Sequence, residues 1–133
     1  MTREIFARWF KQAQHDLEMA GKNISIGGFD IAAFLSHQAV EKLLKAVFAY
    51  QEQKVPKSHY IDEMARELKL PQELIEDILD LTIDYTLARY PDAGFHVPFE
   101  EYSEEISQDK VKRAQRIFSQ ILSLKKVSGE DLP

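Results

Sequence analysis

Apolar side chains recur every three or four residues along the chain, and no segment of useful length alternates with a period of two. The first spacing places apolar groups on one face of an α-helix, whereas a half-buried strand needs the second. We therefore predict an all-α protein, an antiparallel up-and-down helical bundle of about five helices. Because no repeat or linker divides the sequence, residues 1–133 are expected to form a single domain.

Caps, glycines and prolines suggest where the helices begin and end. The expected helices cover about 2–23, 30–51, 58–68, 71–88, and a last stretch from 103 or 107 to 127. The second is apolar around most of its circumference, which predicts that it lies at the centre of the bundle. Two prolines and a glycine predict an irregular segment from Tyr90 to Pro98. The final residues, SGEDLP, are expected to be frayed.

The composition indicates the cellular compartment of the protein and excludes some kinds of catalytic chemistry. The sequence has no cysteine, which excludes thiol nucleophiles and cysteine-based zinc sites and is typical of a reducing compartment. The longest uninterrupted apolar run, Ile31 to Leu35, is far shorter than the roughly 18 residues that span a bilayer. We therefore expect a cytoplasmic protein that is neither exported nor membrane-spanning.

Charge is distributed unevenly along the chain. Seventeen basic and 22 acidic residues give a net charge of -5, which argues against wholesale attraction to a nucleic-acid backbone. Residues 72–84 carry five acidic groups and no cation, whereas residues 109–126 carry six cations and one acid. Two interpretations stay open: two helix faces that attract each other or a partner, and a basic stripe that faces RNA.

The sequence lacks the motifs of several kinds of catalytic site. The Gly21-Lys22 pair has no upstream glycine for a phosphate-binding loop, and no histidine has a glutamate three residues before it. His37 and Glu41 share a helix face, but two ligands without a third do not make a metal site. We expect no metal and no cofactor. His15 and His59 lie in polar contexts, and no role is assigned to them.

Four polar residues interrupt the apolar segment Ser36–Ala46. Gln38, Glu41, Lys42 and Lys45 follow three- and four-residue spacings and share one edge of the expected helix. One interpretation is an intrahelical Glu41–Lys45 pair with lysine stems lying along the surface. The other is the polar lining of a cleft.

Taken in order, several segments resemble one known family. They are a first helix with Trp9, Ala13, Asp16, Leu17 and Ala20, then FDIAAFLSHQAVEKLLKA, SHYI and ARYPD. Their order and spacing from about Phe6 to Leu122 are similar to the HEPN domain, named for its higher-eukaryote and prokaryote nucleotide-binding members. The resemblance implies a helical homodimer, often encoded beside a minimal nucleotidyltransferase as a toxin–antitoxin pair. Some members are metal-independent ribonucleases.

The resemblance also implies a catalytic pair. In ribonuclease members, an Arg and a His separated by four to six residues meet across the dimer cleft, and Arg89 and His96 have six residues between them. A guanidinium can hold a phosphodiester, and an imidazole can move a proton near neutral pH. Pro91 and Gly94 are expected to end the helix between them. In the alternative interpretation, Arg89 pairs with a carboxylate such as Asp92, and His96 is a loop residue.

Three functional hypotheses follow. The first is a HEPN-type dimer that binds a nucleotide, RNA or a nucleotidyltransferase partner through a cleft edged by Lys42, Lys45 and Arg89. The second is an active metal-independent ribonuclease toxin that uses Arg89 and His96 as catalytic residues. The third is a non-catalytic scaffold that acts only through protein association.

Overall fold

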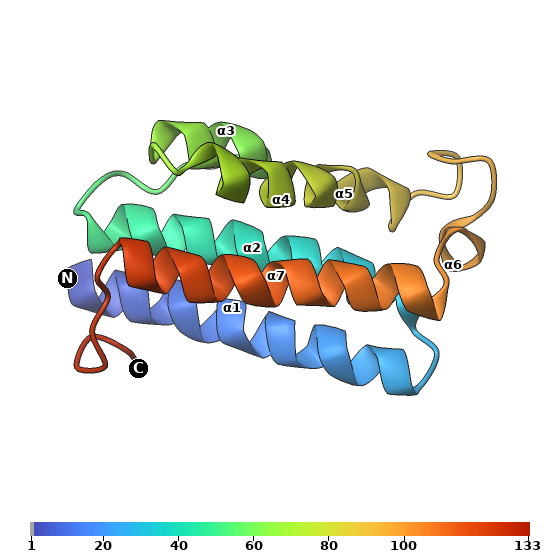
Figure 1. The fold of residues 1–133 in the computed structure, drawn as a ribbon, viewed down its shortest axis with the longest axis horizontal. Coiled ribbons are helices and arrows are strands. Elements are labelled where there is room, and N and C mark those ends of the chain that lie inside the picture. Colours follow the sequence, from blue (N-terminus) through green and yellow to red (C-terminus); the bar gives the residue numbers. More distant parts are fainter. Residues whose placement is uncertain (1) are drawn as a thin grey trace.

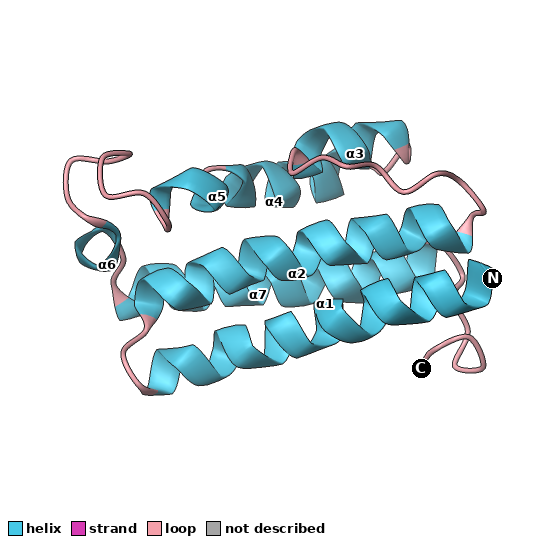
Figure 2. Cartoon of the chain, turned by 180° about the vertical axis from the view of Figure 1, so that it is seen from behind, coloured by secondary structure: helices cyan, strands magenta, loops and turns pink. Residues whose placement is uncertain are grey.

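The computed structural model describes residues 2–133 as an α-helical bundle, with no strand in that range. Its helices are α1 (Thr2–Ser25), α2 (Phe29–Tyr50), α3 (Ile61–Glu67), α4 (Gln72–Thr82), α5 (Asp84–Leu87), α6 (Pro98–Glu101) and α7 (Glu104–Leu124). The three long helices α1, α2 and α7 lie side by side, and α3, α4 and α5 run along another side of α2 (Figures 1 and 2). This arrangement confirms the predicted all-α bundle.

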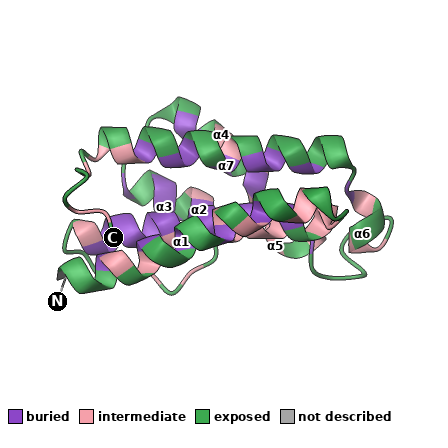
Figure 3. Ribbon diagram, turned by 90° about the horizontal axis from the view of Figure 1, so that it is seen from below, coloured by how far each residue is buried: buried purple, intermediate pink, exposed green. Residues whose placement is uncertain are grey.

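Helix α2 is the centre of the molecule, as its apolar circumference predicts. It contacts each of the other six helices of the described chain. Its buried side chains include Val40, Leu43 and Val47. They belong to the largest apolar cluster, which also contains buried residues of α3, α4 and α7, among them Ile78 of α4. Burying each such side chain contributes about 1.5–3 kcal/mol. The buried parts of the helices face inward, and the exposed parts form the outer surface (Figure 3).

The shorter elements depart from the predicted limits. The helix expected over 71–88 is divided into α4 and α5 near Ile83, and the expected third helix begins only at Ile61. The single turn α6, which begins at Pro98, was not predicted. Helix α7 does begin after Ser103, whose hydroxyl accepts a hydrogen bond from the backbone N–H of Ile106 at 3.1 Å. That cap satisfies one of the free N–H groups at the helix start.

The acidic and basic segments pair with each other. Lys110 of α7 contacts the carboxylates of Asp80 (3.1 Å) and Asp84 (2.9 Å). Arg113 and Arg116, also on α7, both contact Asp77 of α4, at 2.8 and 3.1 Å. The interpretation of two mutually attracting helix faces is therefore confirmed. The alternative, a basic stripe facing RNA, stays a prediction, and three of its cations already have carboxylate partners in the same chain.

The C-terminal tail is held against the bundle, so the prediction that it is frayed was wrong. Asp131 accepts hydrogen bonds from the hydroxyls of Tyr50 (3.0 Å) and Ser128 (2.8 Å), and Arg3 contacts it at 3.2 Å. Leu132 packs against the apolar cluster that contains Phe6. These contacts join residues distant in sequence, which a local pattern does not reveal. Within residues 2–133, no helix combines the length and apolar character that a bilayer crossing requires.

Candidate functional site

Arg89 lies directly after α5, on the surface of the bundle. Its Cζ atom is 5.1 Å from the ring centroids of Tyr85 and Tyr90 and 5.4 Å from that of Phe34 on α2. Aromatic faces attract and orient a guanidinium without neutralising it. Among the residues the structure describes, no carboxylate forms an ion pair with Arg89, and the pair with Asp92 considered from the sequence is not formed. The guanidinium is therefore exposed, oriented and free to bind an anion.

His96 lies in the irregular segment between α5 and α6, which confirms that no continuous helix joins Arg89 to His96. Its backbone N–H donates to Glu101 Oε1 at 2.6 Å, and its side chain is exposed. Gly94 permits this close approach, because a Cβ atom there would lie 2.5 Å from Glu101 Oε1. Across residues 2–133 the imidazole forms no hydrogen bond or ion pair, either with Arg89 or with another group. The structure thus places both residues at the exposed surface, with no hydrogen bond between their side chains within one chain.

A buried ionic cluster occupies the polar edge of α2. Lys45 Nζ lies 3.1 Å from Glu41 Oε2, so the predicted intrahelical pair is confirmed. The pair is buried rather than exposed: Glu41 and Lys45 retain only 4% and 6% of their accessible surface. Glu41 also contacts Nδ1 of His59 at 3.1 Å, and Lys45 lies 5.3 Å from the centroid of the Trp9 ring. The buried carboxylate therefore binds two nitrogen groups at once.

Lys42 directly follows Glu41 on α2 and forms its own ion pair. Its ammonium contacts Asp16 Oδ2 on α1, and Asp16 also accepts a hydrogen bond from the amide of Gln12 at 2.8 Å. Asp16 is buried, which explains why a cation is needed beside it. Both lysines predicted to bind a nucleotide are thus paired with carboxylates of the same chain.

His37 is fully buried between the cluster and the aromatic side chains. Burial lowers its pKa from 6.5 to about 4, against the opposing attraction of Glu41. Its Nε2 atom has no hydrogen-bond partner, and its ring centroid is 5.4 Å from that of Tyr85. A buried imidazole with this pKa is neutral at pH 7.

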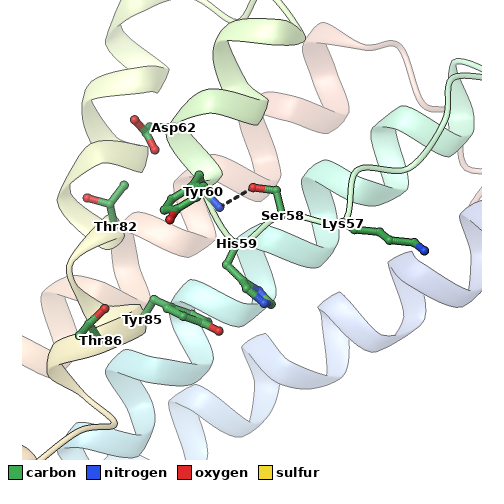
Figure 4. Close-up of a pocket in the computed structure, with 8 residues that line it drawn as sticks. All are labelled: Lys57, Ser58, His59, Tyr60, Asp62, Thr82, Tyr85 and Thr86. Carbon is green, nitrogen blue, oxygen red and sulfur yellow. Dashed lines mark hydrogen bonds between the residues drawn. The ribbon is translucent and has the colours of Figure 1, made fainter.

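A pocket of about 320 Å³ opens between the segment before α3 and the α4–α5 region (Figure 4). The rings of His59 and Tyr85 meet at its wall, with centroids 4.6 Å apart and planes inclined by 19°. Tyr60 and Thr86 also line it. The sequence pattern assigned His59 no role. The one available signal was the SHYI segment, which contributes to the family resemblance and contains His59.

The fold and these segments define a helical-bundle protein with an exposed arginine beside an aromatic pocket. The model of the HEPN domain family matches residues 6–126, so the chain belongs to the HEPN domain family. This confirms the resemblance found in the sequence.

Solved structures support the same assignment. The protein TT1696 from Thermus thermophilus is 27% identical, with a TM-score of 0.84 over 94% of this chain and 99% of the other. An archaeal HEPN homologue is 30% identical, with a TM-score of 0.78 over 90% and 97% of the two chains. An HEPN domain protein from Thermotoga maritima is 26% identical, with a TM-score of 0.72 over 91% and 99%. A comparison with curated proteins gave no match.

Proposed function

We propose that this HEPN-domain protein binds a phosphate group of a nucleotide or an RNA strand through Arg89. The observation that carries the proposal is the state of its guanidinium, which is exposed, lacks a carboxylate partner and lies against three aromatic rings. A planar guanidinium can donate two parallel hydrogen bonds to a phosphate. Aromatic neighbours keep it in place before the phosphate arrives, which reduces the entropy lost on binding.

Lys42 and Lys45 have a supporting part in this proposal. Each ammonium already has a carboxylate partner, so neither offers a full unbalanced charge to a phosphate. Lys42 is the more exposed of the two side chains and can share its remaining donors with a ligand. We therefore expect Arg89 to dominate binding and Lys42 to modulate it.

Binding of mononucleotides and a short oligoribonucleotide, measured by calorimetry, tests the proposal. Arg89→Ala should lose most of the affinity for the nucleotide. Arg89→Lys should recover part of it, because the lysine ammonium keeps the positive charge but cannot donate two parallel hydrogen bonds as the guanidinium does. Arg8→Ala is the matched control, since Arg8 is also exposed and forms no ion pair in the described part of the chain. Equal affinity in wild type and Arg89→Ala would refute the assignment.

We further propose that the protein is a homodimer and the cytoplasmic partner of a minimal nucleotidyltransferase in a toxin–antitoxin-type pair. Exposed apolar side chains on either side of Arg89 in the sequence support an interface, because such groups gain from being covered by a partner. Phe95 is fully exposed, and Phe99 and Ile83 are also largely exposed. Light scattering of a Phe95→Ser/Phe99→Ser variant should show loss of the dimer, whereas Ile26→Ser, which changes an exposed isoleucine elsewhere, should not. A dimer that survives the double substitution would place the interface on another face.

A second candidate function is metal-independent RNA cleavage by Arg89 and His96. It is favoured by one observation: both side chains are exposed and free of hydrogen bonds within residues 2–133, so each can reach a phosphodiester held by a dimer. Cleavage in the presence of a chelator should be lost in Arg89→Ala and in His96→Ala, but not in the exposed-histidine control His15→Ala. Cleavage that persists in His96→Ala would remove the imidazole from the mechanism. Absence of both cleavage and nucleotide binding in an intact dimer would leave the scaffold hypothesis.

A further inference from the structure

We propose that the pocket beside α5 binds the nucleoside part, base and ribose, of a nucleotide whose phosphate is held by Arg89. This inference rests on the proposed function, because it takes Arg89 as the phosphate-binding group. The pocket volume of about 320 Å³ is within the range of small-ligand sites.

The position of the pocket connects it to Arg89. Tyr85 and Thr86 line the pocket, and they precede Arg89 by one helical turn at the end of the same segment. The Tyr85 ring also lies 5.1 Å from Arg89 Cζ. One side chain thus forms part of the pocket wall and supports the guanidinium. A ligand that occupies both places must join a phosphate to a second group of moderate size, as a nucleotide does.

The lining of the pocket suits a flat heterocycle. Tyr60 retains 67% of its accessible surface, and its ring stacks on no other ring in the described part of the chain. In Figure 4 it lies among the residues that surround the pocket, between Asp62 and His59. An exposed tyrosine ring is a stacking surface for a nucleobase. The Thr86 hydroxyl can donate to or accept from the ribose or the base edge.

The pocket lining includes one carboxylate, that of Asp62. Asp62 Oδ2 accepts a hydrogen bond from Arg66 at 2.8 Å, which leaves Oδ1 without a partner. Lys57, the other charged lining residue, points away from the pocket in Figure 4. A carboxylate binds N–H donors, and guanine presents an imino and an amino N–H on the same edge, whereas adenine presents only an amino group there. We therefore infer a preference for a guanine nucleotide.

The pocket wall is fixed before a ligand binds. The carboxylate of Glu41, held in turn by Lys45, contacts His59 Nδ1 at 3.1 Å, and the His59 ring stacks on Tyr85. Because Glu41 is buried, this contact ties the segment before α3 firmly to α2. His59 is thus a positioning residue. Because it holds the pocket wall in place before a ligand arrives, less entropy is lost on binding.

Calorimetry with three ligands tests the pocket separately from Arg89. Guanosine monophosphate contains both parts, ribose 5-phosphate lacks the base, and guanosine lacks the phosphate. We expect Tyr60→Ala to weaken guanosine monophosphate binding by about tenfold or more, the scale of one lost stacking contact. It should leave ribose 5-phosphate binding unchanged, and Tyr60→Phe, which keeps the ring, should bind like the wild type. With adenosine monophosphate as a fourth ligand, Asp62→Asn should remove the preference for guanosine monophosphate over adenosine monophosphate.

The outcomes separate the two proposals. If ribose 5-phosphate binds as tightly as guanosine monophosphate and Tyr60→Ala changes neither, the nucleoside pocket is refuted while phosphate binding by Arg89 stands. If Arg89→Ala leaves all affinities unchanged but Tyr60→Ala abolishes guanosine binding, the pocket stands and the phosphate role is refuted. If none of the three ligands binds the wild type, both proposals are wrong. Circular dichroism of each variant confirms that it is folded.

Discussion

Acid should destabilise this protein in a way that depends on one buried side chain, His37. Its ring has no accessible surface, and its Nε2 atom has no hydrogen-bond partner. Burial lowers its pKa from 6.5 to about 4, despite the attraction of Glu41 and with additional repulsion from His59 and Lys42. The folded protein therefore resists protonation of a group that the unfolded chain protonates readily.

The sign and size of the effect follow from this difference in pKa. Between pH 6.5 and about 4 the unfolded chain binds more protons at this position than the folded chain, so the stability falls as the pH falls. The full contribution is present above pH 6.5. A displacement from 6.5 to about 4 corresponds to about 3 kcal/mol at 1.36 kcal/mol per unit, of which about 2.5 kcal/mol is lost by pH 4.5.

Urea unfolding of wild type and His37→Leu at pH 7.5 and 4.5 measures this contribution. Leucine fills most of the space without a titratable or unpartnered atom, so the variant should lose about 2.5 kcal/mol less than the wild type over that interval. His15→Ala, which removes an exposed histidine, controls for the general effect of acid on the chain. NMR of the imidazole nitrogens should show a neutral His37 ring at pH 5.5. Equal losses in wild type and His37→Leu, or a protonated His37 ring at pH 5.5, would refute the reasoning.

Three further substitutions test the packing and the ion pairs by urea unfolding. Lys110→Met should lower the free energy of unfolding by about 3–5 kcal/mol at pH 7, because the buried Asp84 loses its cation. Burial already raises the pKa of Asp84, so this loss should shrink as acid protonates the carboxylate. A loss that does not change with pH would contradict this explanation. Leu43→Ala should cost about 2–5 kcal/mol, since its side chain is fully buried on α2, and a cost below 1 kcal/mol would place it outside the core. Arg116→Ala should cost less than about 1 kcal/mol, because its pair with Asp77 is partly exposed and screened by water, and a larger loss would show that this pair does more than a surface contact.

The helical architecture could be predicted because its signal is local. A helix brings residues three and four apart onto one face, so Val40, Leu43 and Val47 mark α2 without knowledge of what covers it. The division of the fourth expected helix near Ile83 was not visible in the same pattern, because Ile83 continues the apolar spacing but lies exposed in the structure. Periodicity shows that a face exists and does not show whether a neighbour covers it.

The candidate site was predictable only in part. Arg89 could be identified from the ARYPD segment, and its freedom from carboxylates emerged only once the chain was folded. The sequence alone determined that this protein is an α-helical member of its family with a cation at residue 89, since those properties reside in short stretches of chain. Tertiary structure decided that Lys45 is neutralised by Glu41 inside the bundle and that His59 lies against Tyr85, which is 26 positions away. The physical reason is that burial and charge compensation depend on which distant segments the fold brings into contact.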